Sequence, residues 1–111
     1  MNFYYDNRSV KTLMAVDPAL VKKALVIMAE RTAIPSNQAD GIGFNHYDKE
    51  QGLKWVIQMA SGKRLKKQQI VEARTMLEKY ACQIADEMNQ MVSMTISQRY
   101  QQILKPFKSR L

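Results

Sequence analysis

The chain has 111 residues, 46% of them hydrophobic, which fits one folded domain over residues 1–111 and excludes wholesale disorder. Seventeen Lys and Arg against ten Asp and Glu leave a formal net charge of +7, which favours a polyanionic partner: nucleic acid, an anionic membrane surface or an acidic protein. Cys82 is the only cysteine, so an internal disulfide and a cysteine-based zinc site are both excluded.

The distribution of apolar residues predicts a soluble, cytoplasmic protein with no membrane partner. The first six residues lack the basic start and apolar run of a signal peptide. No stretch approaches the ~18–20 consecutive apolar residues that a membrane-spanning helix needs. A single cysteine also suits a reducing compartment.

Residues 1–16 allow two interpretations. Apolar side chains between positions 10 and 16 recur at spacings that suit a short helix. Tyr4 and Tyr5 could instead begin a strand. The sequence leaves both open.

A helix is predicted from Asp17 to a point before Pro35. Asp17 is a good N-cap acceptor, and Pro18 suits the first helical position because its missing N–H has no partner there anyway. The helix should end before Pro35, since a proline pushes the preceding residue out of the helical region. Its apolar face consists of Leu20, Val21, Ala24, Leu25 and Met28.

A glycine-containing loop is predicted over residues 34–47, with Phe44 as its anchor in the core. Asp48 should then cap a second helix, with Gln51 as its capping-box partner, and Ser61-Gly62 should close that helix. The expected apolar face of this helix contains Leu53, Val56, Ile57 and Ala60.

The segment from about Lys66 to Leu104 contains neither proline nor glycine and predicts a long C-terminal helix. A continuous helix would extend ~58 Å at ~1.5 Å per residue, so we expect it either to bend near Asn89 or to project towards a partner. Pro106 ends it, and residues 105–111 form a basic tail. Together these elements predict an all-α fold.

The long helix carries a heptad-like apolar seam, which predicts a partner-binding surface. In this hypothesis the chain forms a homodimer or grips another protein, as a phage-encoded inhibitor of a host enzyme would. The alternative is that the seam and its methionines pack against the shorter helices. The seam residues are Ile70, Leu77, Ile84, Met88 and Met91.

No set of residues suggests catalysis, a metal site or a cofactor. His46 is the only histidine, and it has no nucleophile or second acid at a diagnostic spacing. It also lacks a second imidazole or thiolate for a metal. Cys82, beside Ala81, is expected to be a small core residue. We therefore expect a binding protein, not an enzyme.

A cluster of cations at the predicted entrance of the long helix is the best functional lead. Flexible cations beside the free N–H groups of a helix N-terminus can bind phosphates, so the cluster predicts nucleic-acid binding with weak sequence specificity. A solvated charged turn is the alternative. Among the aromatic residues, Tyr4, Tyr5 or Trp55 could stack on bases, although core packing is the more common fate of a tryptophan. The predicted phosphate-binding residues are Lys63, Arg64, Lys66, Lys67, Arg74 and Lys79.

A motif over residues 40–84 resembles a short segment appended to some bacterial and phage DNA helicases and related DNA-processing proteins. It reads Asp40-Gly41-x-Gly43-Phe44-Asn45, then Asp48, a short helix, Leu65-x-x-x-Gln69, and Ala73-x-x-Met76-Leu77-x-Lys79-Tyr80-x-x-Gln83. The resemblance implies an accessory module from a phage or mobile element, with DNA a better partner than RNA. The chain has no Walker-type Gly-Lys-Ser/Thr loop, so the resemblance does not imply a motor.

Overall fold

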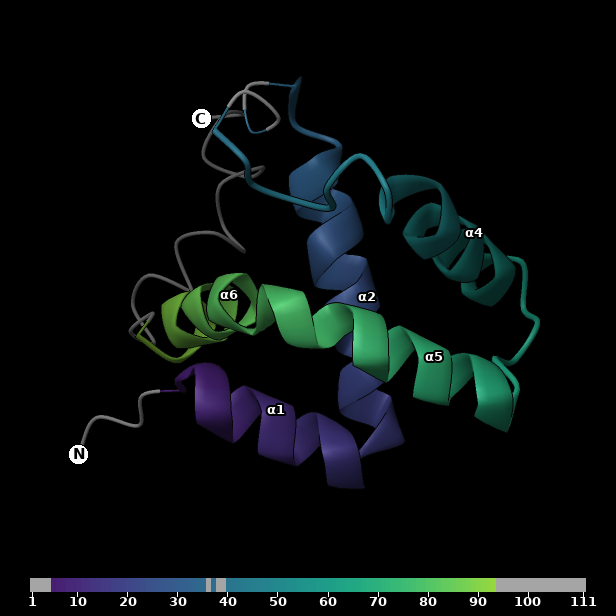
Figure 1. Ribbon diagram of the computed structural model, residues 1–111, viewed down its shortest axis with the longest axis horizontal. Helices are drawn as coiled ribbons and strands as arrows, with labels where there is room; N and C mark the ends of the chain where they lie inside the picture. The colour runs from purple at the N-terminus through teal and green to yellow at the C-terminus, as the bar shows by residue number, and fades with distance from the viewer. Residues whose placement is uncertain (1–4, 36, 38–39, 94–111) are drawn as a thin grey trace, which may run out of the picture.

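Helices make up most of the described chain, which confirms the all-α prediction (Figure 1). The computed structural model describes residues 5–35, 37 and 40–93, and for residues 91–93 it describes the backbone alone. This part of the chain contains no strand. Its elements are α1 (Asn7–Val16), α2 (Pro18–Thr32), α4 (Lys49–Ala60), α5 (Lys67–Leu77), the 3-10 helix η1 (Glu78–Tyr80) and α6 (Ala81–Ser93).

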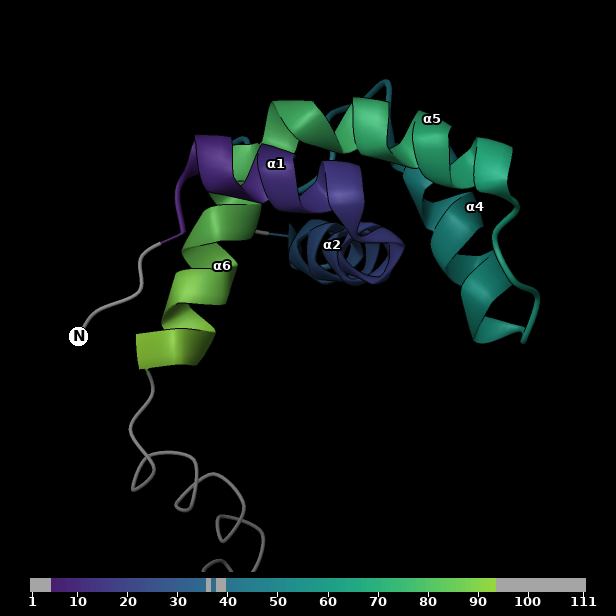
Figure 2. The ribbon, with the colours of Figure 1, turned by 90° about the horizontal axis from the view of Figure 1, so that it is seen from below.

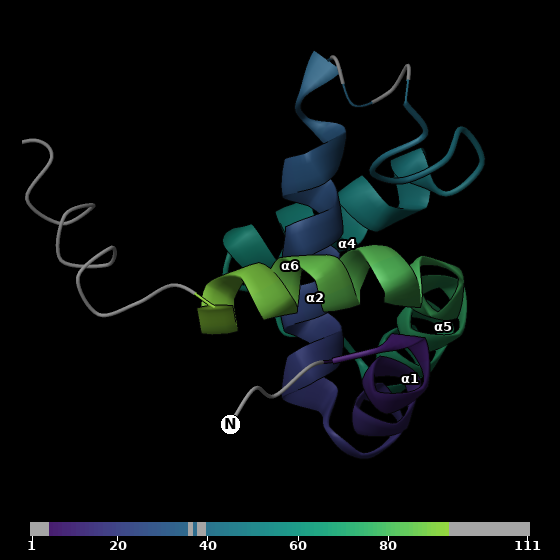
Figure 3. The same cartoon turned by 90° about the vertical axis from the view of Figure 1, so that its left-hand side faces the viewer.

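Helix α2 is the centre of the fold and packs against α1, α4, α5 and α6. Viewed along α2, the other helices surround it on one side as an arch (Figure 2). From the left-hand side, α6 crosses in front of α2 and α4 lies behind it (Figure 3). The helix can pack against four neighbours because its buried side chains occur around much of its circumference. They are Leu20, Val21, Ala24, Leu25, Ile27 and Met28.

The N-terminal segment forms a helix, so of the two interpretations the helical one is right for residues 7–16. Asp6 caps it: its carboxylate accepts the Ser9 N–H at 2.7 Å, and the Ser9 hydroxyl accepts the Asp6 N–H at 2.9 Å. Tyr5 lies outside any strand because Asn89 of α6 holds its backbone, accepting its N–H and donating to its carbonyl. Tyr4 lies outside the described residues.

Both predicted ends of α2 and the predicted C-terminal end of α4 are confirmed. Asp17 accepts the Ala19 N–H at 3.0 Å, and α2 ends at Thr32, before Pro35. Helix α4 closes in a Schellman motif, in which Gly62 adopts a φ of 89° and its N–H donates to the Met59 carbonyl. The buried face of α4 differs from the prediction, however. Trp55 is buried, whereas Ile57 is exposed, since the helix turns Gly52 and Trp55 towards the core.

The long helix is broken, which corrects the prediction of one element from 66 onwards. A 3-10 turn at η1 separates α5 from α6, and α6 runs off in a different direction (Figure 2). The bend is not near Asn89, where it was expected, because α6 continues without a break past that residue. The Asn89 side chain instead binds the Tyr5 backbone. Residues 94–111, including the predicted basic tail, lie outside the described residues.

The predicted partner-binding seam forms part of the protein's own core. Leu77 and Ile84 are completely buried, Met88 is nearly so, and Ile70 packs against the same cluster. The side chain of Met91 lies outside the described residues. Because of the bend at η1, α5 packs on α2, and α6 packs on α1 and α2. Leu77, Ile84 and Met88 are therefore covered by the protein itself and cannot contact a partner. Cys82, expected in the core, is exposed because α6 buries Ala81 and Ala85 instead.

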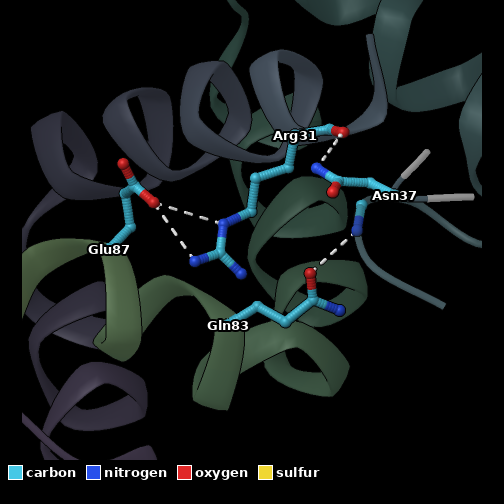
Figure 4. Close-up of polar contacts among 5 residues, drawn as sticks. Arg31, Asn37, Gln83 and Glu87 are labelled. Atoms are coloured by element: carbon cyan, nitrogen blue, oxygen red, sulfur yellow. Dashed lines mark hydrogen bonds and ion pairs between the residues drawn. The ribbon is translucent and has the colours of Figure 1, made fainter. Parts of the chain in front are cut away.

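Polar contacts join the far end of α2 to α6 (Figure 4). The Arg31 guanidinium donates to the Glu87 carboxylate at 3.1 Å, and both side chains are partly shielded from solvent. Asn37 donates to the Arg31 carbonyl, and Gln83 accepts the Gly43 N–H at 2.8 Å. These contacts fix the loop that follows α2.

Within the described ranges, no helix has the length and apolar content to cross a membrane.

Candidate nucleic-acid interface

The connection between α4 and α5, taken together with the first residue of α5, spans residues 61–67 and carries four of the predicted phosphate-binding cations. We call this segment the basic turn. Gln58 of α4 and Gln69 of α5 exchange two amide hydrogen bonds of 3.0 Å, and Gln58 also donates to the Arg64 carbonyl. Leu65 is buried in the core in the middle of the turn. The backbone of the basic turn is therefore fixed, although its cationic side chains are exposed.

The fold adds a cation that the sequence pattern did not reveal. Lys22, one turn into α2, lines a hollow of about 210 Å³ together with Lys63 and Arg64. Lys66 and Lys67 follow directly and are also exposed. Among the described residues, none of these five cations forms an ion pair. Within that part of the chain no acid pairs with them, so this face is a candidate anion-binding surface.

The two remaining predicted cations lie elsewhere. Lys79 lies in η1, beyond the end of α5 that is opposite the basic turn, and α5 alone is about 16 Å long for 11 residues at ~1.5 Å each. Arg74 faces a different groove, formed by α1, the start of α2 and α5. Arg74 shares this groove with Lys67, the last cation of the basic turn. The structure therefore keeps Lys63, Arg64 and Lys66 in one turn, places Lys67 between the turn and Arg74, and separates Lys79 from the rest.

Lys79 belongs to a polar cluster that we call the Asp48 corner, formed by Asn45, Asp48, Lys79 and Tyr80. The Asp48 carboxylate accepts hydrogen bonds of 2.6 Å from both the Lys79 ammonium and the Tyr80 hydroxyl. The Tyr80 hydroxyl in turn accepts the Asn45 N–H at 3.0 Å. Lys79 is therefore neutralised within the fold.

Asp48 precedes α4 as predicted, but its side chain does not cap the helix. Asn45 instead fixes the turn that leads into α4, because its side-chain oxygen accepts the N–H groups of Tyr47 and Asp48 at 2.9 Å each. The carboxylate of Asp48 is thereby free to bind Tyr80 and Lys79. The predicted capping box with Gln51 is wrong.

The Asp48 corner shifts two pKa values in opposite directions. Burial raises the pKa of Asp48, but the hydrogen bonds from Lys79 and Tyr80 together outweigh burial and leave the pKa below its usual value. Burial, reinforced by the hydrogen bond to Asp48, raises the pKa of Tyr80 to about 12. The ionised carboxylate and the protonated phenol are the states that the fold stabilises.

The glycine-containing loop packs closely on its neighbours, and Phe44 is buried as predicted. The Phe44 ring meets Tyr80 edge to face with centroids 5.5 Å apart, and a Cβ at Gly52 would lie 2.6 Å from the Phe44 ring. Gly43 has a φ of 96°, and a Cβ there would lie 2.8 Å from the Thr32 Cα. The glycine-containing loop thus packs against Tyr80, and its described contacts there hold the fold together.

One exposed aromatic side chain was missed by the sequence analysis. Tyr47 is 88% exposed beside a hollow of about 370 Å³ whose lining includes His46 and Lys49. Its ring meets that of His46 edge to face. Trp55 is buried and therefore unavailable for stacking. Exposure is a property of the fold, and no sequence signal distinguished Tyr47 from Trp55.

Known proteins offer no guide to this site. No family model matches the chain, no curated protein is similar to it, and no solved structure resembles it. Among the described residues, no three potential metal ligands lie together. The geometry and charge of the site are therefore the basis for inferring its function.

Proposed function

We propose that the protein binds the phosphate backbone of nucleic acid, DNA in preference to RNA, through the basic turn and Lys22. The observation that carries the proposal is the group of five cations around one fixed turn, none of them paired within the described part of the chain. Because the backbone of the turn is already fixed, little conformational entropy is lost when its flexible cationic side chains bind phosphates.

The interface contains no helix that presents a set of base-reading side chains, so recognition through the phosphates should be largely independent of sequence. The resemblance of residues 40–84 to helicase-appended segments points the same way. In this proposal the protein is a non-enzymatic accessory factor of phage or mobile-element origin that acts in the cytoplasm.

Fluorescence anisotropy with labelled single- and double-stranded DNA, measured over a range of salt concentrations, tests the proposal. The affinity should fall steeply with salt, because each neutralised phosphate of a single strand contributes about −0.7 to the slope of log K against log salt. The double variant Lys63→Glu/Arg64→Glu should weaken binding strongly and reduce the slope by more than 1.

A matched control is available on α1, where Arg8 and Lys11 are also exposed. The variant Arg8→Glu/Lys11→Glu changes the net charge equally but leaves the basic turn intact, so it should retain most of the binding. Equal losses in both variants would show that net charge alone attracts DNA. Absence of binding by the original protein at low salt would refute the proposal.

A further inference from the structure

The groove between α1, the start of α2 and α5 combines an apolar lining with positive charge. It has a volume of about 360 Å³, at the lower end of the ~300–1,000 Å³ that ligand pockets usually have. The apolar part of its lining includes Met14, Val16, Pro18, Ile70 and Val71. Lys67 and Arg74, two turns apart on α5, supply the charge.

Two features of this groove are unusual for a plain solvated surface. Val16 is 74% exposed and Val71 is 40% exposed, so large apolar side chains on both α1 and α5 remain in water. Arg74 has its Nε atom buried without a hydrogen-bond partner. A buried donor without an acceptor costs stability, and it shows that no described acceptor engages this side of the guanidinium.

We propose that this groove binds a short acidic segment of a partner protein, with an apolar side chain seated between Val16 and Val71 and a carboxylate paired with Arg74. The guanidinium suits a carboxylate because its N–H groups match the two carboxylate oxygens. A nucleic-acid strand fits less well, since its phosphates would meet only two cations on an apolar surface. The inference does not depend on the proposed nucleic-acid function.

The sites differ in their residues, so they can be tested separately. The proposed nucleic-acid site includes Lys22, Lys63 and Arg64, whereas the groove includes Val16, Val71 and Arg74. Lys67 belongs to the basic turn and also lines the groove, so no test variant changes it. The probe is a panel of eight-residue peptides in which one Leu, Ile, Phe or Trp is flanked by Asp and Glu. Panels with Lys in place of the acids, or Gly in place of the apolar residue, are the controls.

Titration of the isotope-labelled full chain, followed by NMR, is the measurement. Acidic peptides with an apolar residue should shift the resonances of Val16, Val71 and Arg74, and the control panels should not. Arg74→Gln should weaken binding roughly tenfold or more, as expected for the loss of a charge-assisted hydrogen bond. Val16→Glu, a change at an exposed position, should weaken it as well, whereas Lys11→Gln should have no effect.

Three results would overturn the inference. The first is that no acidic peptide shifts the groove resonances at millimolar concentration. The second is that Arg74→Gln and Val16→Glu bind the peptides as well as the original protein does. The third is that DNA perturbs the groove and the peptides leave it unchanged.

Discussion

The Asp48 corner and the basic turn lie at opposite ends of α4, and a lysine has a different environment in each. Lys79 at the corner donates to Asp48 at 2.6 Å. Lys63 in the basic turn has no ion-pair partner among the described residues. Both backbones are fixed by side-chain hydrogen bonds, Asn45 to its own loop and Gln58 to Gln69. Whether a lysine stabilises the fold or attracts a ligand therefore depends on the acid within its reach.

The largest effect should come from Gly43→Ala, in the loop that leads to the Asp48 corner. A Cβ would lie 2.7–2.9 Å from atoms of Thr32, including its backbone, at a φ of 96°. Overpacking and backbone strain should together reduce the free energy of unfolding by about 3 kcal/mol, measured by urea denaturation. Gly41→Ala is the control: it has φ of 71° but nothing within 4 Å, so only about 1 kcal/mol should be lost. Equal losses would contradict the close packing at Gly43.

A pair of lysine substitutions tests the comparison directly. Lys79→Gln should reduce the free energy of unfolding by about 0.5–1 kcal/mol, since it removes a half-exposed ion pair, and should leave DNA affinity nearly unchanged. Lys63→Gln should weaken DNA binding and leave the free energy of unfolding nearly unchanged. Urea denaturation and DNA anisotropy on the two variants check both statements. If Lys79→Gln weakened DNA binding as much as Lys63→Gln, the distinction between the two regions would be wrong.

The smallest expected effect is a pH dependence of the free energy of unfolding that arises from Asp48 in the Asp48 corner. The pKa of Asp48 is lower in the folded chain than in the unfolded one, so its stabilising contribution is present above the unfolded pKa, about 4. It is lost as the pH falls through the folded pKa. Asp48→Asn should therefore flatten the loss of stability below pH 4, as followed by thermal unfolding. A variant with the same acid sensitivity as the original chain would show that Asp48 is not responsible.

Much of the local structure could be predicted from single residues. Asp17 and Pro18 begin α2, and Ser61-Gly62 ends α4, because these signals act through hydrogen bonds and φ preferences within a few residues. The exposure of the basic turn likewise follows from its composition. Such features need no knowledge of distant parts of the chain.

The break in the long helix could not be predicted, because no proline or glycine marks it. It coincides with Tyr80, whose hydroxyl bonds to Asp48, 32 residues earlier in the chain. Once α6 turns, Leu77 and Ile84 face the core instead of a partner. Cys82 is exposed for the same reason, since the buried face of α6 is chosen by what it packs against.

The sequence by itself determined the helical class, the N-cap of α2, the C-terminal end of α4 and a basic segment between α4 and α5, since periodicity and local hydrogen bonding encode them. The tertiary structure decided which charges remain free. It placed Lys22 beside Lys63 and Arg64, paired Lys79 with Asp48, and set Arg74 at the edge of an apolar groove. Those outcomes depend on contacts between residues far apart in the chain, and spacing along one helix carries no information about them.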